Sequence, residues 1–153
     1  MSLLSNLING ISLGSVYAII ALGYTMVYGI AKMLNFAHGD VIMIGAYMVL
    51  TLLTGAGVNP WLAVLIGMIT CTVLGITIEK VAYRPLRGAS PLAVLITAIG
   101  VSYLLQSLAQ IIFGSAPKMV TVYEFGAVQF LGATVQVSAL VTMAVTLLVM
   151  VVL

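Results

Sequence analysis

The charged residues divide the chain into long uncharged runs, and these runs constrain the fold more than any other feature. Only 5% of the 153 residues are charged, whereas an ordinary soluble domain has about 25%. The uncharged runs cover residues 1–31, 41–78, 88–117 and 125–153. Because a helix needs about 20 apolar residues to cross the hydrocarbon core of a bilayer, each run has room for at least one membrane span.

A bilayer offers no water to the backbone, so a spanning segment is either a helix or part of a closed barrel. Runs this long and apolar predict helices. We therefore expect an all-α, polytopic transmembrane helix bundle that forms one domain over residues 1–153. Its five or so spans are predicted at residues 7–31, 35–53, 61–81, 92–113 and from 137 onward.

Residues 119–136 differ from these spans. They are rich in Val, Thr, Tyr and Phe, with Gly126 and Gly132 as breaks. This composition predicts a short β-hairpin or an extended loop.

The basic residues predict the orientation of the chain. Lys32, Lys80, Arg84 and Arg87 fall on one side of the membrane, and Lys118 falls on the other with the amino terminus. Short basic loops stay in the cytoplasm, so we expect the N-terminus outside and residues 119–136 at the periplasmic surface. A net charge of +2 is too small to indicate nucleic-acid binding.

Small residues recur at helical spacing in two spans. Gly10, Gly14 and Ala18 lie in the first span, and Gly67 and Gly75 lie in the third. Such spacing lets helix backbones approach closely in lipid. It fits a subunit or gating interface, but ordinary packing within the bundle is the interpretation we favour, because the spacing is common in membrane helices.

The most informative stretch joins the first and second predicted spans and contains Asn35, His38, Gly39 and Asp40. Polar residues near or inside a membrane tend to mark a pathway or a switch, and Gly39 would let the backbone bend. The alternative is a turn in which Asn35 caps a helix and Lys32 pairs with Asp40. No metal site is predicted, because His38 has no second His or Cys at ligand spacing.

Three blocks of the chain resemble the H-type permease subunit of bacterial branched-chain amino-acid ABC importers. They follow one another in the family's order and span most of the chain. The matching residues are Gly10, Gly14, Tyr17, Ala18, Ala21–Gly23, Tyr28, Gly29, Asn35–Asp40, Met43 and Gly45–Tyr47, then Glu79–Arg87, then Leu95–Ser102, Leu105 and Gln106.

The resemblance implies a membrane permease in the bacterial inner membrane. Such a subunit forms a heterodimer with a second permease subunit, two cytoplasmic ATPases drive it, and a periplasmic binding protein delivers leucine, isoleucine or valine. The chain itself would be no enzyme and would need no cofactor, since it has no phosphate-binding Gly-rich loop of the Walker type. ATP hydrolysis would belong to the partners.

Two further groups gain an interpretation from the resemblance. Ser102 and Gln106 share one face of the fourth span, where they would line the translocation path or make a hydrogen bond between helices. Glu79, Arg84 and Arg87 follow the third span on the cytoplasmic side. They would form an orienting ion-pair cluster, or else contact an ATPase.

The length departs from the family pattern. Subunits of this family are about twice as long and carry a cytoplasmic coupling segment after the fifth span. We therefore expect this sequence to be a fragment truncated within that span, unable by itself to engage an ATPase productively or to transport.

Other functions stay open at this point. The chain could instead be part of a related ABC permease that carries urea or short amides, or a non-transporting scaffold of packed membrane helices. A membrane enzyme using His38 and Asp40 as an acid–base pair would need a third polar group, for which Gln106 and Glu79 are the available donors.

Overall fold

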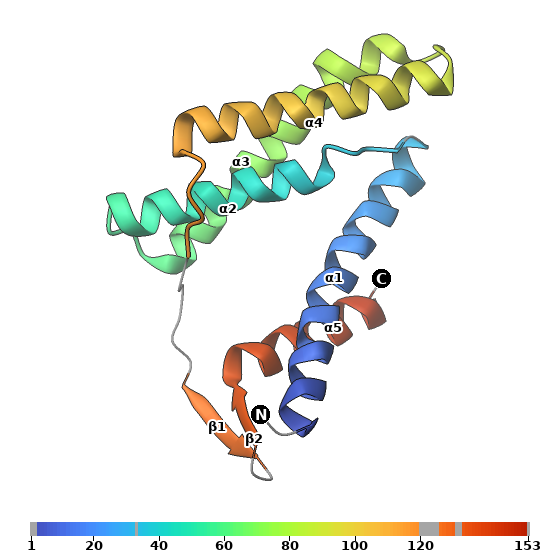
Figure 1. Cartoon of the computed structure of the whole chain (residues 1–153). Coiled ribbons are helices and arrows are strands. Elements are labelled where there is room, and N and C mark those ends of the chain that lie inside the picture. The colour runs from blue at the N-terminus through green and yellow to red at the C-terminus, as the bar shows by residue number, and fades with distance from the viewer. Residues whose placement is uncertain (1–2, 33, 120–125, 131–132, 153) are drawn as a thin grey trace. The chain divides into compact units, whose positions relative to one another are not determined.

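A computed structural model describes residues 3–32, 34–119, 126–130 and 133–152. These residues form five helices and one short hairpin (Figure 1). The helices are α1 (Leu3–Ala31), α2 (His38–Gly55), α3 (Pro60–Ile78), α4 (Pro91–Phe113) and α5 (Val137–Val152). The strands are β1 (Ala127–Phe130) and β2 (Ala133–Gln136). The predicted helical bundle with about five spans is confirmed.

Four helical segments in the described residues are long and apolar enough to cross a membrane. They are Leu3–Ile30, His38–Gly55, Pro60–Leu86 and Pro91–Phe113. The fifth helix, α5, is apolar and has 16 residues.

The chain divides into two compact units. One unit combines Met1–Ile30 with Tyr123–Leu153, and the other is Ala31–Val122. That residues 1–153 form one transmembrane domain stays a prediction.

The first unit contains α1, the hairpin and α5. Strands β1 and β2 pair antiparallel, with Ala127 opposite Gln136 and Phe130 opposite Ala133, and α5 follows β2 directly. The predicted hairpin is therefore present at 126–130 and 133–136, while residues 120–125 and 131–132 of the predicted segment lie outside the described residues. On α5, the buried Thr146 hydroxyl donates to the Ser15 carbonyl at 3.3 Å, which ties α5 to α1.

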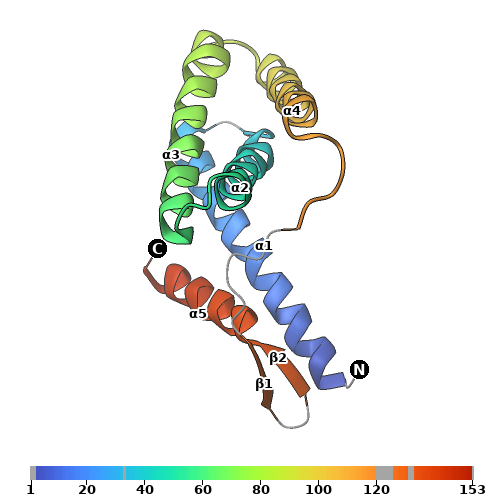
Figure 2. The same cartoon turned by 90° about the vertical axis from the view of Figure 1, so that its left-hand side faces the viewer.

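The second unit contains α2, α3 and α4, and α2 packs against both of the others (Figure 2). Its core is small, with Ala37, Ile78, Tyr83, Ala98 and Leu105 buried together. Two of its helices start at prolines preceded by a capping side chain, as helix starts commonly do. Asn59 accepts from the Trp61 N–H at 3.0 Å and Ser90 accepts from the Ala93 N–H at 3.4 Å.

The third predicted span continues further than expected. We predicted its end at residue 81, but a π-helical turn at Glu79–Tyr83 and a 3-10 turn at Arg84–Leu86 carry the helix on to residue 86. Pro85 lacks an N–H, and its ring would clash with the carbonyl four residues earlier in a regular α-helix. The wider turn ahead of Pro85 accommodates that ring.

Glycines bring α2 and α3 close together. A Cβ on Gly67 would lie 2.7 Å from Val49 Cγ2 and 3.3 Å from the Gly45 carbonyl oxygen. A Cβ on Gly45 would collide with the sulfur of Cys71, which itself donates to the Val41 carbonyl at 3.4 Å. This crossing therefore requires glycine on both helices.

The other small residues singled out in the sequence lie elsewhere. Among the described residues, a Cβ on Gly10, Gly14 or Gly75 would meet nothing within 4 Å, and Ala18 is half-buried on α1. Their role in helix packing stays a prediction.

Candidate functional site

A polar cluster joins α2 to α4. The Asp40 carboxylate accepts a hydrogen bond from the Ser102 hydroxyl on one oxygen, and one from the Gln106 side-chain amide on the other at 3.0 Å. The Gln106 amide also donates to Ser102 at 3.2 Å. Asp40 is 8% exposed and Ser102 and Gln106 are half-buried, so the three side chains form a partly buried network that crosses between two helices.

The cluster lies near the middle of α4. Asp40 pairs with Gln106, and seven residues further along each helix Tyr47 stacks on Phe113, with ring centroids 4.6 Å apart. The two helices therefore run parallel in a constant register. Ser102 and Gln106 lie about 17 and 22 Å from the start of α4, a helix of 23 residues and about 35 Å.

Asn35 holds the chain where α2 begins. Its side-chain oxygen accepts from the Ala37 N–H at 3.1 Å and from the Tyr83 hydroxyl at 2.8 Å. Its backbone carbonyl accepts from the His38 N–H at 3.2 Å. Asn35 thus closes the turn that precedes α2 and fastens it to the π-helical turn after α3.

The remaining residues of the motif occupy the first turn of α2. His38 is its first residue and is half-buried, whereas Gly39 is exposed, with nothing among the described residues within 4 Å of a Cβ built on it. The alternative pairing of Lys32 with Asp40 is not observed among the described residues, where Ser102 and Gln106 donate to that carboxylate. Lys32 is exposed, with a left-handed φ of 55°.

The candidates predicted to lie in a cytoplasmic loop form a separate group. Arg87 and Glu79 make an ion pair at 2.6 Å, and both side chains are exposed. Arg84 lies exposed in the 3-10 turn between them. An exposed pair of this kind contributes about 0–1 kcal/mol, so it adds little to stability, and its orienting role stays a prediction.

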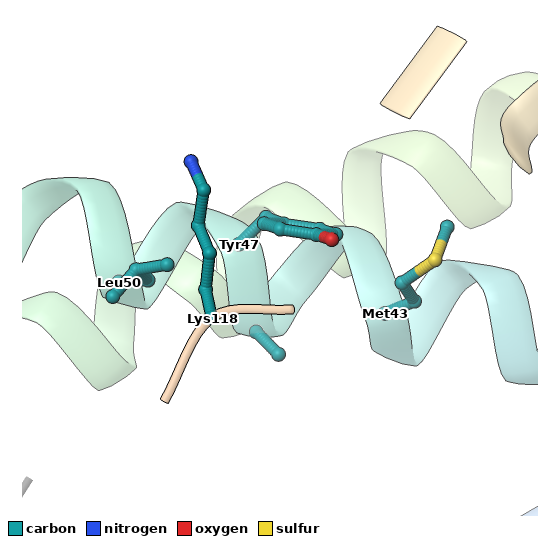
Figure 3. Close-up of a pocket in the computed structure, with 5 residues that line it drawn as sticks. Met43, Tyr47, Leu50 and Lys118 are labelled. Atoms are coloured by element: carbon teal, nitrogen blue, oxygen red, sulfur yellow. The ribbon is translucent and has the colours of Figure 1, made fainter. Parts of the chain in front are cut away.

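One pocket adjoins the polar cluster, and a second lies further along α2. The larger, about 330 Å³, is lined by Asp40, Met43, Tyr47, Gln106, Ala109, Gln110, Gly114 and Ser115. The smaller, about 210 Å³, is lined by Met43, Ala46, Tyr47, Leu50 and Lys118. Figure 3 shows Lys118 beside Tyr47 over α2 in the smaller pocket. Met43 and Tyr47 line both pockets.

Two residues of this region were not singled out as site candidates from the sequence. Tyr83 binds Asn35, and Tyr47 separates the two pockets. Both tyrosines fall inside the resembling blocks, but nothing in their local pattern shows which distant residue each one meets. Among the described residues, no group of three His, Cys, Asp or Glu side chains is placed to hold a metal ion.

Long apolar helices around a polar cluster are typical of a multi-pass membrane protein. The chain belongs to the family described as branched-chain amino acid transport system / permease component, whose model matches residues 6–153.

Relatives of known name agree with this membership. The high-affinity branched-chain amino acid transport system permease protein BraD of Pseudomonas aeruginosa is 39% identical over 160 residues, covering 96% of this chain and 52% of that protein. The corresponding permease protein LivH of Escherichia coli is 48% identical over 120 residues, covering 73% and 39%. The chain spans about half the length or less of these relatives. No solved structure matches.

Proposed function

We propose that this chain is part of a permease subunit of an ABC importer that carries branched-chain amino acids across the bacterial inner membrane. The family match over residues 6–153 carries the proposal. The partly buried cluster of Asp40, Ser102 and Gln106 supports it, because ionisable groups within membrane spans mark substrate or ion pathways.

The partners in this proposal are a second permease subunit, two cytoplasmic ATPase subunits and a periplasmic binding protein. The names of the relatives, which describe a transport system with a permease component, support an assembly of this kind. Exposed apolar side chains on the described helices, such as Leu62, Leu65 and Ile69 on α3, need lipid or a partner helix to cover them.

The proposed orientation places the N-terminus outside and the basic turns in the cytoplasm. Within the second unit, Arg84 and Arg87 lie between the end of α3 and the start of α4. Lys118 follows the opposite end of α4 and lines a pocket with Leu50. This separation supports the positive-inside assignment.

The translocation path in this proposal runs beside the first turn of α2. Asn35 and Tyr83 hold the start of the helix, while Asp40, Ser102 and Gln106 present polar groups midway along α4. His38 and Gly39 lie in the same turn. A helix that begins part-way along its neighbour resembles the discontinuous helices that form binding sites in many transporters.

An uptake experiment tests the function. The full-length permease is produced with its partner subunits and binding protein in a bacterial strain that lacks branched-chain amino-acid uptake, and labelled leucine and labelled urea are supplied separately. We expect leucine to accumulate only when the ATPases are active. Accumulation of urea without leucine would contradict the proposed substrate class.

A further inference from the structure

The two pockets along α2 together form what we call the α2–α4 groove. Its larger part has Asp40 and Gln106 at one side, and its smaller part has Ala46, Leu50 and Lys118. Met43 and Tyr47 belong to both parts. The larger part therefore offers a carboxylate beside the apolar surface of Met43 and Tyr47.

Asp40 has acceptor capacity left for a ligand in this groove. A carboxylate has about four acceptor positions, and the described residues use one on each oxygen, from Ser102 and Gln106. Both of these donors are neutral. A buried carboxylate with only neutral donors bears a large desolvation cost, which a cationic group reduces.

The apolar stretch has the character that an aliphatic side chain needs. Met43 and Leu50 supply flexible and branched apolar surface, and the Tyr47 ring is held in place by its stack on Phe113. The volumes of about 330 and 210 Å³ lie near the lower end of the range for small-molecule sites, roughly 300 Å³. A small amino acid fits this size class.

We propose that the α2–α4 groove binds an aliphatic amino acid as a zwitterion, with its ammonium group on Asp40 and its side chain against Met43 and Tyr47. This assignment rests on the proposed transport function and names the residues that would recognise the substrate.

The test measures binding separately from transport. In the full-length transporter with Cys71→Ala, a cysteine is placed in the groove by Ala46→Cys or, as a control on the same helix, outside it by Ile42→Cys. Both positions are exposed, and Ile42 lines neither pocket. Alkylation by a small thiol reagent is timed with and without leucine.

We expect leucine to slow alkylation at position 46 several-fold and to leave position 42 unchanged. With Asp40→Asn added, the leucine concentration for half protection rises about tenfold or more, the scale of one lost charge-assisted hydrogen bond. In the Ala46→Cys transporter with Asp40 unchanged, we expect 3-methylbutylamine, which keeps the ammonium group of leucine, to slow alkylation at position 46. We expect 4-methylpentanoate, which lacks that group, to leave the alkylation rate unchanged.

Three results would overturn the assignment: equal protection at positions 42 and 46, no protection at 46, or equal protection by the amine and the acid. The two analogues need no change at Asp40, so the test stands even if Asp40→Asn does not assemble. Leucine uptake is measured on the same Ala46→Cys transporter. Normal uptake without protection refutes the groove alone, whereas absence of leucine uptake by the unmodified transporter refutes the proposed function.

Discussion

Replacing Gly67 by alanine should destabilise the α2–α3 crossing. The added methyl group would lie 2.7 Å from Val49 Cγ2 and 3.3 Å from the Gly45 carbonyl oxygen. Neither distance is an ordinary van der Waals contact, and the carbonyl belongs to the backbone and cannot rotate away. Overpacking of this kind costs about 1–3 kcal/mol, and we expect Gly67→Ala to fall in this range.

The matched control is Gly75→Ala on the same helix. A Cβ there meets nothing within 4 Å among the described residues, and alanine is the better helix former by up to about 1 kcal/mol. The two substitutions are chemically identical, so the helix-propensity gain cancels and only the contact differs. Thermal denaturation of the full-length permease complex in detergent, followed by size-exclusion chromatography, compares them.

A second substitution identifies the contact responsible. Val49→Ala removes the methyl group that would collide, so the double variant should regain part of the stability lost in Gly67→Ala. The double-mutant cycle isolates this coupling. Equal melting temperatures for Gly67→Ala and Gly75→Ala would refute the close crossing, and strictly additive effects of Gly67→Ala and Val49→Ala would show that Val49 is not the obstacle.

Three further predictions concern the polar residues and the topology. In the complete transporter, His38→Ala and Asp40→Ala should each lower leucine uptake more than they lower the amount of permease in the membrane; normal uptake per molecule in both would remove these residues from the path. Tyr83→Phe deletes the hydroxyl that binds Asn35 at 2.8 Å and should cost about 1 kcal/mol in thermal stability, whereas Tyr103→Phe, at an exposed position on α4, should change little; an equal loss in both would contradict the anchoring role. Cysteines replacing Ala56 and Ala89 should react with an impermeant thiol reagent, the first from outside and the second from inside. These positions are chosen because the neighbouring Gly57 and Gly88 have positive φ, which disfavours other residues there. The reverse labelling pattern would invert the predicted orientation.

Local features of this fold could be predicted from the sequence. The uncharged runs define the helices because the bilayer requires about 20 apolar residues for a span. The Val, Thr, Tyr and Phe content of 119–136 predicted the hairpin, since β-branched and aromatic residues fit a pleated strand. Ser102 and Gln106 were placed on one helical face by their four-residue spacing, and in the structure they do share Asp40 as a partner.

Contacts between helices could not be predicted in the same way. Asp40 lies 62 residues from Ser102, and helical periodicity gives the face of each helix but not the register between two of them. The second helix starts at His38 rather than at the predicted residue 35, because the Asn35 side chain accepts from the Ala37 N–H and holds residues 35–37 in a turn. The hydrogen bond from the Tyr83 hydroxyl to Asn35 joins residues 48 positions apart, so no local sequence pattern indicates it.

The start of α2 shows why the fold and the proposed function use the same residues. A helix that begins midway along its neighbour exposes its first N–H groups at a depth where no lipid can accept from them. Asn35 meets this requirement by accepting from the N–H groups of Ala37 and His38. The positive end of the helix dipole then favours a negative group in the first turn, which is where Asp40 lies, with Ser102 and Gln106 donating to it. The first turn of α2 therefore holds a carboxylate beside a pocket, where a positively charged substrate group would find its partner.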